Sequence, residues 1–277
     1  MITLVNKCCT VVVDPDMGLT VESFTFQGEE LLHQDSARKR AGRTYGIPIL
    51  FPTPNRVAND RYVFNDKMVP AVMHGFLRHR VFDIESRSDT HIAGRITFDG
   101  SEPLFPYSAE VLVTISLIGS TLRWEFHLTN TGDEPFGYGL ALHPFFVKKK
   151  GMTLETNGHQ RLVTDENMLP TEEIVEERPS SDVDTLASDA IFRCDGPSTS
   201  TLRGDGIELK ILGSPAFGYT VVYTGLESAF ICIEPQSCAI NAHNLADQEL
   251  AALQVLESNQ EHLHWVEMRL SRLPGSP

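Results

Sequence analysis

Two histidines and one glutamate stand in apolar or turn-forming segments, where a titratable side chain needs a reason to be present. His74 precedes a glycine, His143 interrupts the apolar run 138–147, and Glu234 follows the apolar run 229–233. A carboxylate that is partly withdrawn from water has a raised pKa, which suits a general base. The sequence has no G-x-S-x-G nucleophile motif, no phosphate-binding loop and no complete set of metal ligands. Together these side chains favour chemistry by proton transfer.

Each of the three residues also has a purely structural explanation. His74 could be a histidine whose ring is satisfied by hydrogen bonds, and the ring of His143 could have a buried partner instead of facing a cleft. Glu234 could simply emerge into water at the end of its strand. A shared location of the three side chains would favour catalysis over these alternatives.

The segment 46–56 contains three prolines and ends in Asn55-Arg56. Proline restricts the backbone, so this segment is expected to be extended and rigid. It would then deliver Asn55 and Arg56 to a defined place. Arg56 could equally be a surface cation beside a proline-stiffened edge strand.

Short runs of alternating apolar and polar residues, separated by turn-forming residues, dominate the chain. The clearest predicted hairpin joins 110–118 to 121–129 through Gly119-Ser120. Similar turns are expected at Asn65-Asp66 and Asp205-Gly206. We therefore predict an all-β fold, a large antiparallel β-sandwich.

Two segments depart from this pattern. A helical periodicity is limited to 247–255, and the acidic, proline-containing segment 172–184 is expected to be an exposed loop. This loop is too short to link two domains, and no internal repeat of fixed period is present. We predict a single domain over residues 1–277.

Composition and charge exclude several classes of function. The formal net charge of −14 leaves no basic face for phosphate neutralisation, so we expect no nucleic-acid partner. No run approaches the roughly 20 apolar residues of a membrane span, and the first ten residues do not resemble a signal peptide, so we expect a cytoplasmic protein.

Five cysteines without C-x-x-C spacing favour buried thiols over disulfides or zinc. His262 and His264 could begin a metal site, but the sequence offers no third ligand.

Four segments, in this order along the chain, resemble the aldose 1-epimerase (galactose mutarotase-like) family. They are Gly46 to Pro52 with Asn55-Arg56, His74-Gly75-Phe76, Leu142 to Phe145, and Cys232 to Gln236. The resemblance extends over roughly residues 10–270 and implies a β-supersandwich that works without a cofactor or metal. It implies that Glu234 is the general base that takes the C1 hydroxyl proton, and that His143 is the general acid for the ring oxygen.

The same resemblance implies a set of substrate-binding residues. His74 and Arg56 are similar to family residues that bind the sugar hydroxyls and the developing charge on oxygen. Asp189 resembles a substrate-binding aspartate that precedes a phenylalanine. Asn55 lies within the first matching motif and Arg78 follows the second by two residues, and we include both in the predicted binding site.

The resemblance leaves the sugar open. The sequence His74 to Arg78 is closer to a shorter subgroup that includes enzymes of hexose 6-phosphates, whereas Pro54-Asn55-Arg56 is similar to members that act on free sugars. Apart from Arg78, Arg80 and Arg43, no further phosphate clamp is evident, so the sequence favours a neutral aldohexose.

The expected activity is interconversion of the α and β anomers of an aldohexose, by a monomer or homodimer with a small-molecule sugar as its partner. The alternatives are a hexose-6-phosphate mutarotase, a non-catalytic carbohydrate-binding protein on the same fold, and a metal-dependent isomerase.

Overall fold

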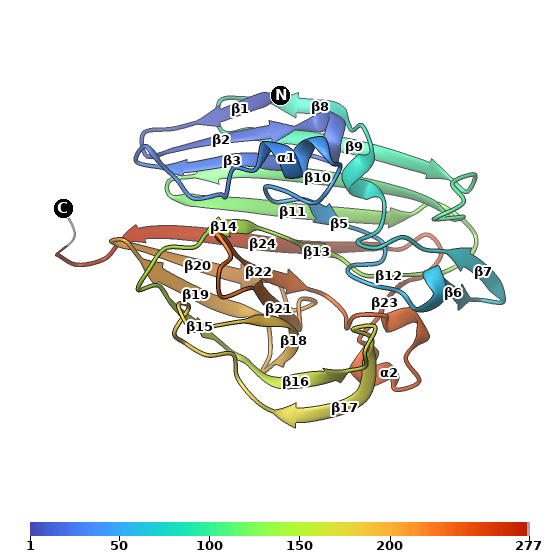
Figure 1. The fold of residues 1–277 in the computed structure, drawn as a ribbon. Helices are drawn as coiled ribbons and strands as arrows, with labels where there is room; N and C mark the ends of the chain where they lie inside the picture. The colour runs from blue at the N-terminus through green and yellow to red at the C-terminus, as the bar shows by residue number, and fades with distance from the viewer. Residues whose placement is uncertain (276–277) are drawn as a thin grey trace.

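The computed structural model describes residues 1–275, which are organised as antiparallel β-sheets packed in layers (Figure 1). The first layer is a sheet of eight strands, called here the long sheet. Its strands are β8 (Asp83–Arg87), β9 (His91–Asp99), β10 (Ser108–Ile118), β11 (Thr121–Asn130), β15 (Thr153–Thr156), β19 (Thr199–Gly204), β20 (Ile207–Gly213) and β24 (Glu261–Arg272). They are arranged in the order β15-β19-β20-β24-β11-β10-β9-β8.

Two further sheets face the long sheet. The N-terminal sheet consists of β1 (Ile2–Val5), β2 (Cys9–Asp14), β3 (Thr20–Phe26) and β4 (Glu29–Glu30), paired in chain order. The site sheet consists of β5 (Ile49–Leu50), β13 (Ala141–Leu142), β14 (Phe145–Val147), β16 (Gly158–Thr164), β17 (Pro170–Glu176), β18 (Ser188–Cys194), β21 (Tyr219–Thr224) and β22 (Phe230–Gln236). Its order is β17-β16-β18-β21-β22-β13-β5, with β14 also on β22.

One hydrophobic core joins the three sheets. It includes Val11 from the N-terminal sheet, Trp124 from the long sheet and Ile233 from the site sheet, all fully buried. Burial of such side chains is the main favourable contribution to folding. The predicted all-β sandwich is therefore confirmed.

The predicted hairpin of β10 and β11 shows how alternation produces the layer. Buried and part-exposed residues alternate along β10 and along most of β11, so one face of each strand meets the core. Gly119 has φ 58°, the left-handed conformation that a two-residue hairpin turn requires. The hairpins at Asn65-Asp66 and Asp205-Gly206 are present as well.

The remaining elements are short. They are α1 (Ser36–Arg40), α2 (Gln248–Ala251), the 3₁₀ turns η1 (Pro15–Met17), η2 (Ala58–Asp60), η3 (Leu77–His79) and η4 (Ala242–Asn244), and the paired strands β6 (Arg61–Phe64) with β7 (Lys67–Pro70) and β12 (Phe136–Tyr138) with β23 (Gln254–Leu256). In residues 1–275, neither helix has the length and apolar character needed to cross a membrane.

Two predictions about single segments were wrong in part. The helical pattern 247–255 gives only one turn, α2, and its end forms β23. The acidic segment 172–184 is a loop only after Glu176, because its first residues pair with β16 as strand β17. The pairing partner lies in another segment, so local acidity did not reveal it. The single domain over 1–277 stays a prediction, and residues 276 and 277 lie outside those described.

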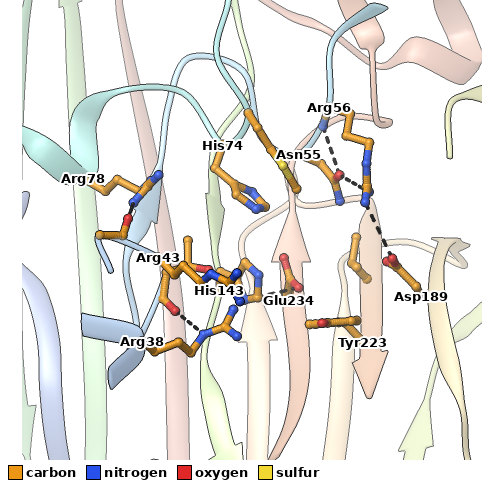
Figure 2. A pocket seen from close by; sticks show the side chains of 14 residues that line it. Arg38, Arg43, Asn55, Arg56, His74, Arg78, His143, Asp189, Tyr223 and Glu234 are labelled. Atoms are coloured by element: carbon orange, nitrogen blue, oxygen red, sulfur yellow. Dashed lines mark hydrogen bonds and ion pairs between the residues drawn. The ribbon is translucent and has the colours of Figure 1, made fainter. Parts of the chain in front are cut away.

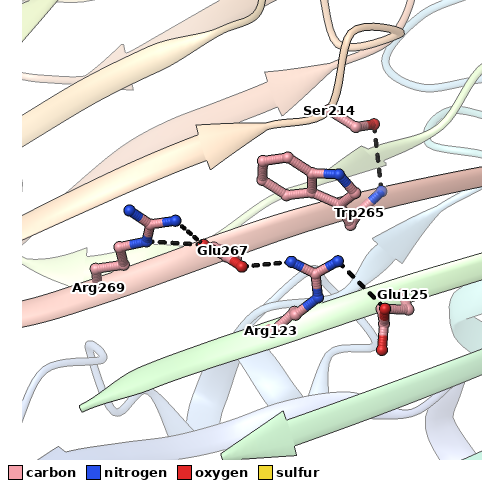
Figure 3. A network of polar contacts seen from close by, with 6 residues as sticks. All are labelled: Arg123, Glu125, Ser214, Trp265, Glu267 and Arg269. Carbon is pink, nitrogen blue, oxygen red and sulfur yellow. Dashed lines mark hydrogen bonds and ion pairs between the residues drawn. The ribbon is translucent and has the colours of Figure 1, made fainter. Parts of the chain in front are cut away.

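Polar side chains also fix the long sheet. The Arg123 guanidinium pairs with Glu267 and, at 3.2 Å, with Glu125, while Arg269 Nε donates to Glu267 at 2.7 Å (Figure 3). The Arg123 guanidinium carbon also lies 5.0 Å from the centre of the Trp265 ring. Because the Glu267 carboxylate is nearly buried between two arginines, its charge is compensated.

His262 and His264, which could have begun a metal site, share a different partner. The buried Tyr138 hydroxyl lies 2.8 Å from His262 Nδ1 and 2.7 Å from His264 Nε2. This tyrosine lies between the sheets, so the pair of histidines contributes to a buried polar cluster.

Candidate active site

Strand β22 presents Glu234 on the face of the site sheet that points away from the main core. Ile231 and Ile233 belong to that core, and the side chains of a strand alternate between its faces. In the pairing of β22 with β21, Glu234 lies opposite Val221, and in the pairing of β18 with β21, Asp189 lies opposite Tyr223. Three neighbouring strands thereby form a polar floor.

This floor is the base of a cavity of about 420 Å³ (Figure 2). All seven predicted site residues line it: Asn55, Arg56, His74, Arg78, His143, Asp189 and Glu234. Seven further residues complete the lining: Arg38, Gly42, Arg43, Thr44, Met73, Val221 and Tyr223. The structure thus brings together residues that are spread over nearly 200 positions of the chain. The roles of these residues stay predictions.

His143 lies in the gap between β13 and β14, where Pro144 interrupts the strand. Its backbone N–H donates to the Pro48 carbonyl at 3.2 Å, so the proline-rich segment holds the histidine directly. The imidazole is stacked on the Phe145 ring at 4.5 Å and meets the His74 ring edge to face at 5.2 Å. The ring orientation is therefore fixed by packing on both sides.

Glu234 and His143 form a buried pair at the bottom of the cavity. Oε1 of the glutamate lies 3.3 Å from Nδ1 of the histidine, and their side chains are only 2% and 5% exposed. Glu234 Oε2 and His143 Nδ1 have no well-aligned hydrogen bond within residues 1–275. Unsatisfied buried polar atoms are costly, and a catalytic role is one of the reasons for which native structures retain them.

Burial changes the proton affinity of both groups. Burial and then the neighbouring His74 and Arg38 hold the pKa of His143 well below its usual 6.5. Burial and then Asp189 hold the pKa of Glu234 well above its usual 4.5. Both shifts favour the uncharged form of each group, a protonated Glu234 beside a neutral His143, so the pair holds a single shared proton at neutral pH.

The shared proton predicts a flat pH profile. Concerted acid–base chemistry needs one protonated and one unprotonated member, so activity is lost when the pair gains a second proton. Because the pKa of His143 is lowered, we expect kcat/KM to be level around pH 6.5 and to fall only well below it. The pH dependence of kcat/KM checks this, with melting temperatures at each pH to identify unfolding. An acid limb centred at pH 6.5 would contradict the shared proton.

Two loops cross above the pair and hold His74 and Asn55. Both residues have left-handed backbones, with φ 68° and 62°, and the His74 N–H donates to the Asn55 carbonyl at 2.8 Å. Gly75 lies against Phe51, because an added Cβ would be 2.0 Å from the Phe51 carbonyl oxygen. Glycine is thus required here for two reasons: the close contact of the two backbones, and a φ of +66° that other residues rarely adopt.

Replacing Gly75 by alanine is expected to destabilise the protein and the site together. The left-handed backbone alone costs about 1–3 kcal/mol, and the overlap with Phe51 adds to it. Gly119→Ala is the matched control, since Gly119 has φ +58° and open space around it. Urea unfolding should show a clearly larger loss for Gly75→Ala. Equal losses in the two variants would mean that the loop contact is not tight.

Arg56 and Asp189 lie on the same side of the cavity, with Nη2 3.9 Å from Oδ2, and Arg56 Nη1 donates to Asn55 Oδ1 at 3.2 Å (Figure 2). His74 is nearly buried, and burial, with Arg78 and Arg56 next, lowers its pKa to about 3. The imidazole of His74 is therefore neutral at pH 7 and available as a hydrogen-bond donor or acceptor.

Sequence reasoning missed several lining residues. Arg38, Thr44 and Tyr223 carried no signal in the sequence that would place them in a site. Tyr223 lies in the floor of the cavity because the register of β21 and β18 places it beside Asp189. This register between distant segments cannot be derived from one sequence. Arg80, by contrast, pairs with Glu102 and does not line the cavity.

Three potential metal ligands meet at the same place. The ligand atoms of His143, Cys232 and Glu234 lie within 4.8 Å of one another. These are ligand types that zinc accepts. Burial and then Glu234 raise the pKa of the Cys232 thiol, which disfavours the thiolate that binds metal. The arrangement fits proton transfer better than metal binding.

Comparison with known proteins relates both the sequence and the fold to one group. A family model described as aldose 1-epimerase matches residues 1–269. The structure is similar to the Slr1438 protein from Synechocystis, with a TM-score of 0.86 and 23% identity over 98% of this chain and 96% of that chain.

Other solved structures share the fold at lower identity. A galactose mutarotase-like protein from Clostridium acetobutylicum has a TM-score of 0.86 and 16% identity, covering 98% of this chain and 95% of that one. A GalM/aldose epimerase homologue from C. elegans has a TM-score of 0.81 and 18% identity, covering 98% of each.

Proposed function

Because the chain belongs to the aldose 1-epimerase family, an isomerase family, we propose that this cavity interconverts the α and β anomers of an aldohexose. The observation that carries the proposal is the buried Glu234–His143 pair, 3.3 Å apart at the base of a cavity large enough for a sugar ring. Glu234 is the general base and His143 the general acid in this proposal.

In the reactive form of this pair, the single shared proton lies on His143 and Glu234 is a carboxylate. Glu234 takes the proton of the C1 hydroxyl while His143 protonates the ring oxygen, O5, and the C1–O5 bond breaks to give the open-chain aldehyde. Rotation about the C1–C2 bond presents the other face of the carbonyl. O5 then attacks C1 and returns its proton to His143, and Glu234 protonates the carbonyl oxygen, so one turnover leaves both groups unchanged.

The surrounding side chains hold the sugar in this scheme. Neutral His74 and the Asn55 amide bind hydroxyls, and the Arg56 guanidinium stabilises negative charge that develops on oxygen. Asp189, beside Arg56, accepts hydrogen bonds from hydroxyls, while Arg78 on the opposite side contributes a further donor. Each role rests on a position in the cavity lining.

Polarimetry tests the activity directly. Freshly dissolved α-D-glucose or α-D-galactose should relax to its equilibrium rotation faster with the protein than in buffer. Relaxation at the buffer rate for every common aldose, and for glucose 6-phosphate, would refute the proposal. Sugar binding by calorimetry without acceleration would instead indicate a carbohydrate-binding protein.

We propose that the reaction needs no cofactor or metal, because the His143 and Glu234 side chains suffice for both proton transfers. EDTA should then leave the relaxation rate unchanged. Loss of activity in EDTA, restored by added zinc, would instead favour a metal-dependent isomerase acting through Cys232 as well.

We also propose a cytoplasmic location and a monomer or homodimer. All five cysteines are free thiols in the structure, which is typical of a reducing compartment. Size-exclusion chromatography with light scattering would determine the number of copies.

A further inference from the structure

The adjacent residues Cys8 and Cys9 form a pair of free thiols outside the active-site cavity, called here the dithiol pair. Cys9 Sγ lies 3.9 Å from Cys8 Sγ. Cys8 is half-buried, whereas Cys9 and the three other cysteines of the chain are buried. The proposed reaction uses neither thiol of the pair, and the half-buried Cys8 gives a ligand access to it.

The two sulfurs meet because the chain bends just before β2. In a regular strand, adjacent side chains point to opposite faces, so their sulfurs would lie apart. Here β2 begins only at Cys9, and Cys8 belongs to the bend between β1 and β2. The Asn6 side chain shapes this bend, since its Oδ1 accepts the backbone N–H groups of Cys8 and Cys9, both at 3.0 Å. The Gln27 N–H donates to the Cys8 carbonyl at 2.7 Å, so the bend is also tied to the end of β3.

The surroundings of the dithiol pair favour thiols over thiolates. The Cys8 Sγ lies 3.3 Å from the Gly119 carbonyl oxygen and 3.4 Å from Asn6 Oδ1, and both oxygens accept hydrogen bonds. Burial and then the neighbouring Cys8 raise the pKa of Cys9 to about 12. Zinc, by contrast, binds thiolates and usually takes four ligands. In residues 1–275 no third histidine, cysteine or carboxylate ligand joins the two sulfurs. The pair is therefore unsuited to a zinc ion.

The dithiol pair also resists closure to a disulfide. The peptide bond between Cys8 and Cys9 is trans. A trans peptide separates neighbouring Cα atoms by about 3.8 Å, whereas a disulfide usually joins Cα atoms about 4.4–6.8 Å apart. The two sulfurs therefore stay available to a ligand that binds both of them and accepts both thiol protons.

We propose that Cys8 and Cys9 together form a binding site for trivalent arsenicals of the type R–As(OH)₂. Each thiol proton joins one hydroxyl of the arsenical, which leaves as water, so two As–S bonds replace two As–O bonds and the arsenic stays trivalent. An atom with bonds of about 2.3 Å to sulfur, the length in zinc thiolate sites, spans sulfurs about 3.3–4.0 Å apart at bond angles of about 90–120°. The separation of 3.9 Å lies within this range.

The second As–S bond provides most of the affinity. Cys8 reacts first because it is the more accessible thiol, and the Cys9 sulfur then reacts within the same complex. A second, intramolecular attachment raises affinity by about 10²–10⁴-fold over a single one. The site is independent of the proposed function, because neither cysteine lines the active-site cavity.

Phenylarsine oxide, which is hydrated to the dihydroxy form in water, is the probe for the test on the whole folded protein. One equivalent should add one phenylarsenic group per chain in the intact mass spectrum. The number of thiols that iodoacetamide then alkylates in urea should fall from five to three, because two sulfurs are bound to arsenic. Excess glutathione should leave the adduct in place, whereas dimercaptopropanol, a dithiol, should remove it. An absent adduct, or the loss of only one thiol, would refute the site.

Cys8→Ser is the decisive variant, because a half-buried side chain can be replaced without opening a cavity in the core. The dissociation constant of phenylarsine oxide should rise by about 10²–10⁴-fold. Cys9→Ala should show the same loss, with its melting temperature measured because Cys9 is buried. Cys194→Ala, the matched control for a buried thiol, should bind as the wild type does. Wild-type affinity in Cys8→Ser would overturn the assignment whatever the result for Cys9→Ala.

Discussion

Replacing Glu234 by glutamine is expected to lower kcat/KM by about 10²–10⁴-fold, the usual contribution of one general acid–base group. Glutamine has nearly the same shape and fits the buried position on β22, but its amide cannot accept the C1 hydroxyl proton. The loss should therefore appear mainly in kcat, with sugar affinity retained. Polarimetric rates over a range of sugar concentrations, with calorimetry for binding, separate the two.

Glu227→Gln is the matched control, because it is an exposed carboxylate in the turn of the same β21–β22 hairpin. It should behave as the wild type. Equal activity in Glu234→Gln and the wild type, with both proteins folded, would remove the glutamate from the mechanism. Circular dichroism and the melting temperature establish the folded state of each variant.

Replacing His143 by glutamine is expected to give a loss of similar size, about 10²–10⁴-fold in kcat/KM. The imidazole, 3.3 Å from the glutamate, is the acid that protonates O5 in this scheme. Without it, O5 must leave C1 as an unprotonated alkoxide, which is a poorer leaving group. Because the two groups act as one unit, kcat/KM of the double variant should be about equal to that of the less active single variant. The same polarimetric assay measures all three proteins.

His243→Gln provides a control for the loss of an imidazole. His243 is a half-buried ring with a lowered pKa that contacts Tyr62 and the Gly137 carbonyl, away from the cavity. Its replacement should lower the melting temperature without a comparable loss of kcat/KM. If the losses from Glu234→Gln and His143→Gln multiply in the double variant, the two side chains work independently and the shared-proton scheme is wrong.

Alternation along the chain was sufficient to predict many of the strands and the class of fold. In β22, the order of apolar residues and Glu234 also indicates which face meets the core, because side chains alternate with a period of two. Turn chemistry predicted the β10–β11 hairpin for the same local reason, since Gly119 supplies a left-handed backbone. Strand β17 was missed because its pairing depends on a distant partner.

For the site, the sequence determined which side chains could transfer a proton, and the order of the family motifs singled out Glu234 and His143. Only the tertiary structure decided that their atoms lie 3.3 Å apart, that burial shifts their pKa values in opposite directions, and that Arg38 reaches the same cavity. The physical reason is that residue type and periodicity act locally, whereas distance, desolvation and the sum of charges in a cavity depend on segments far apart in the chain.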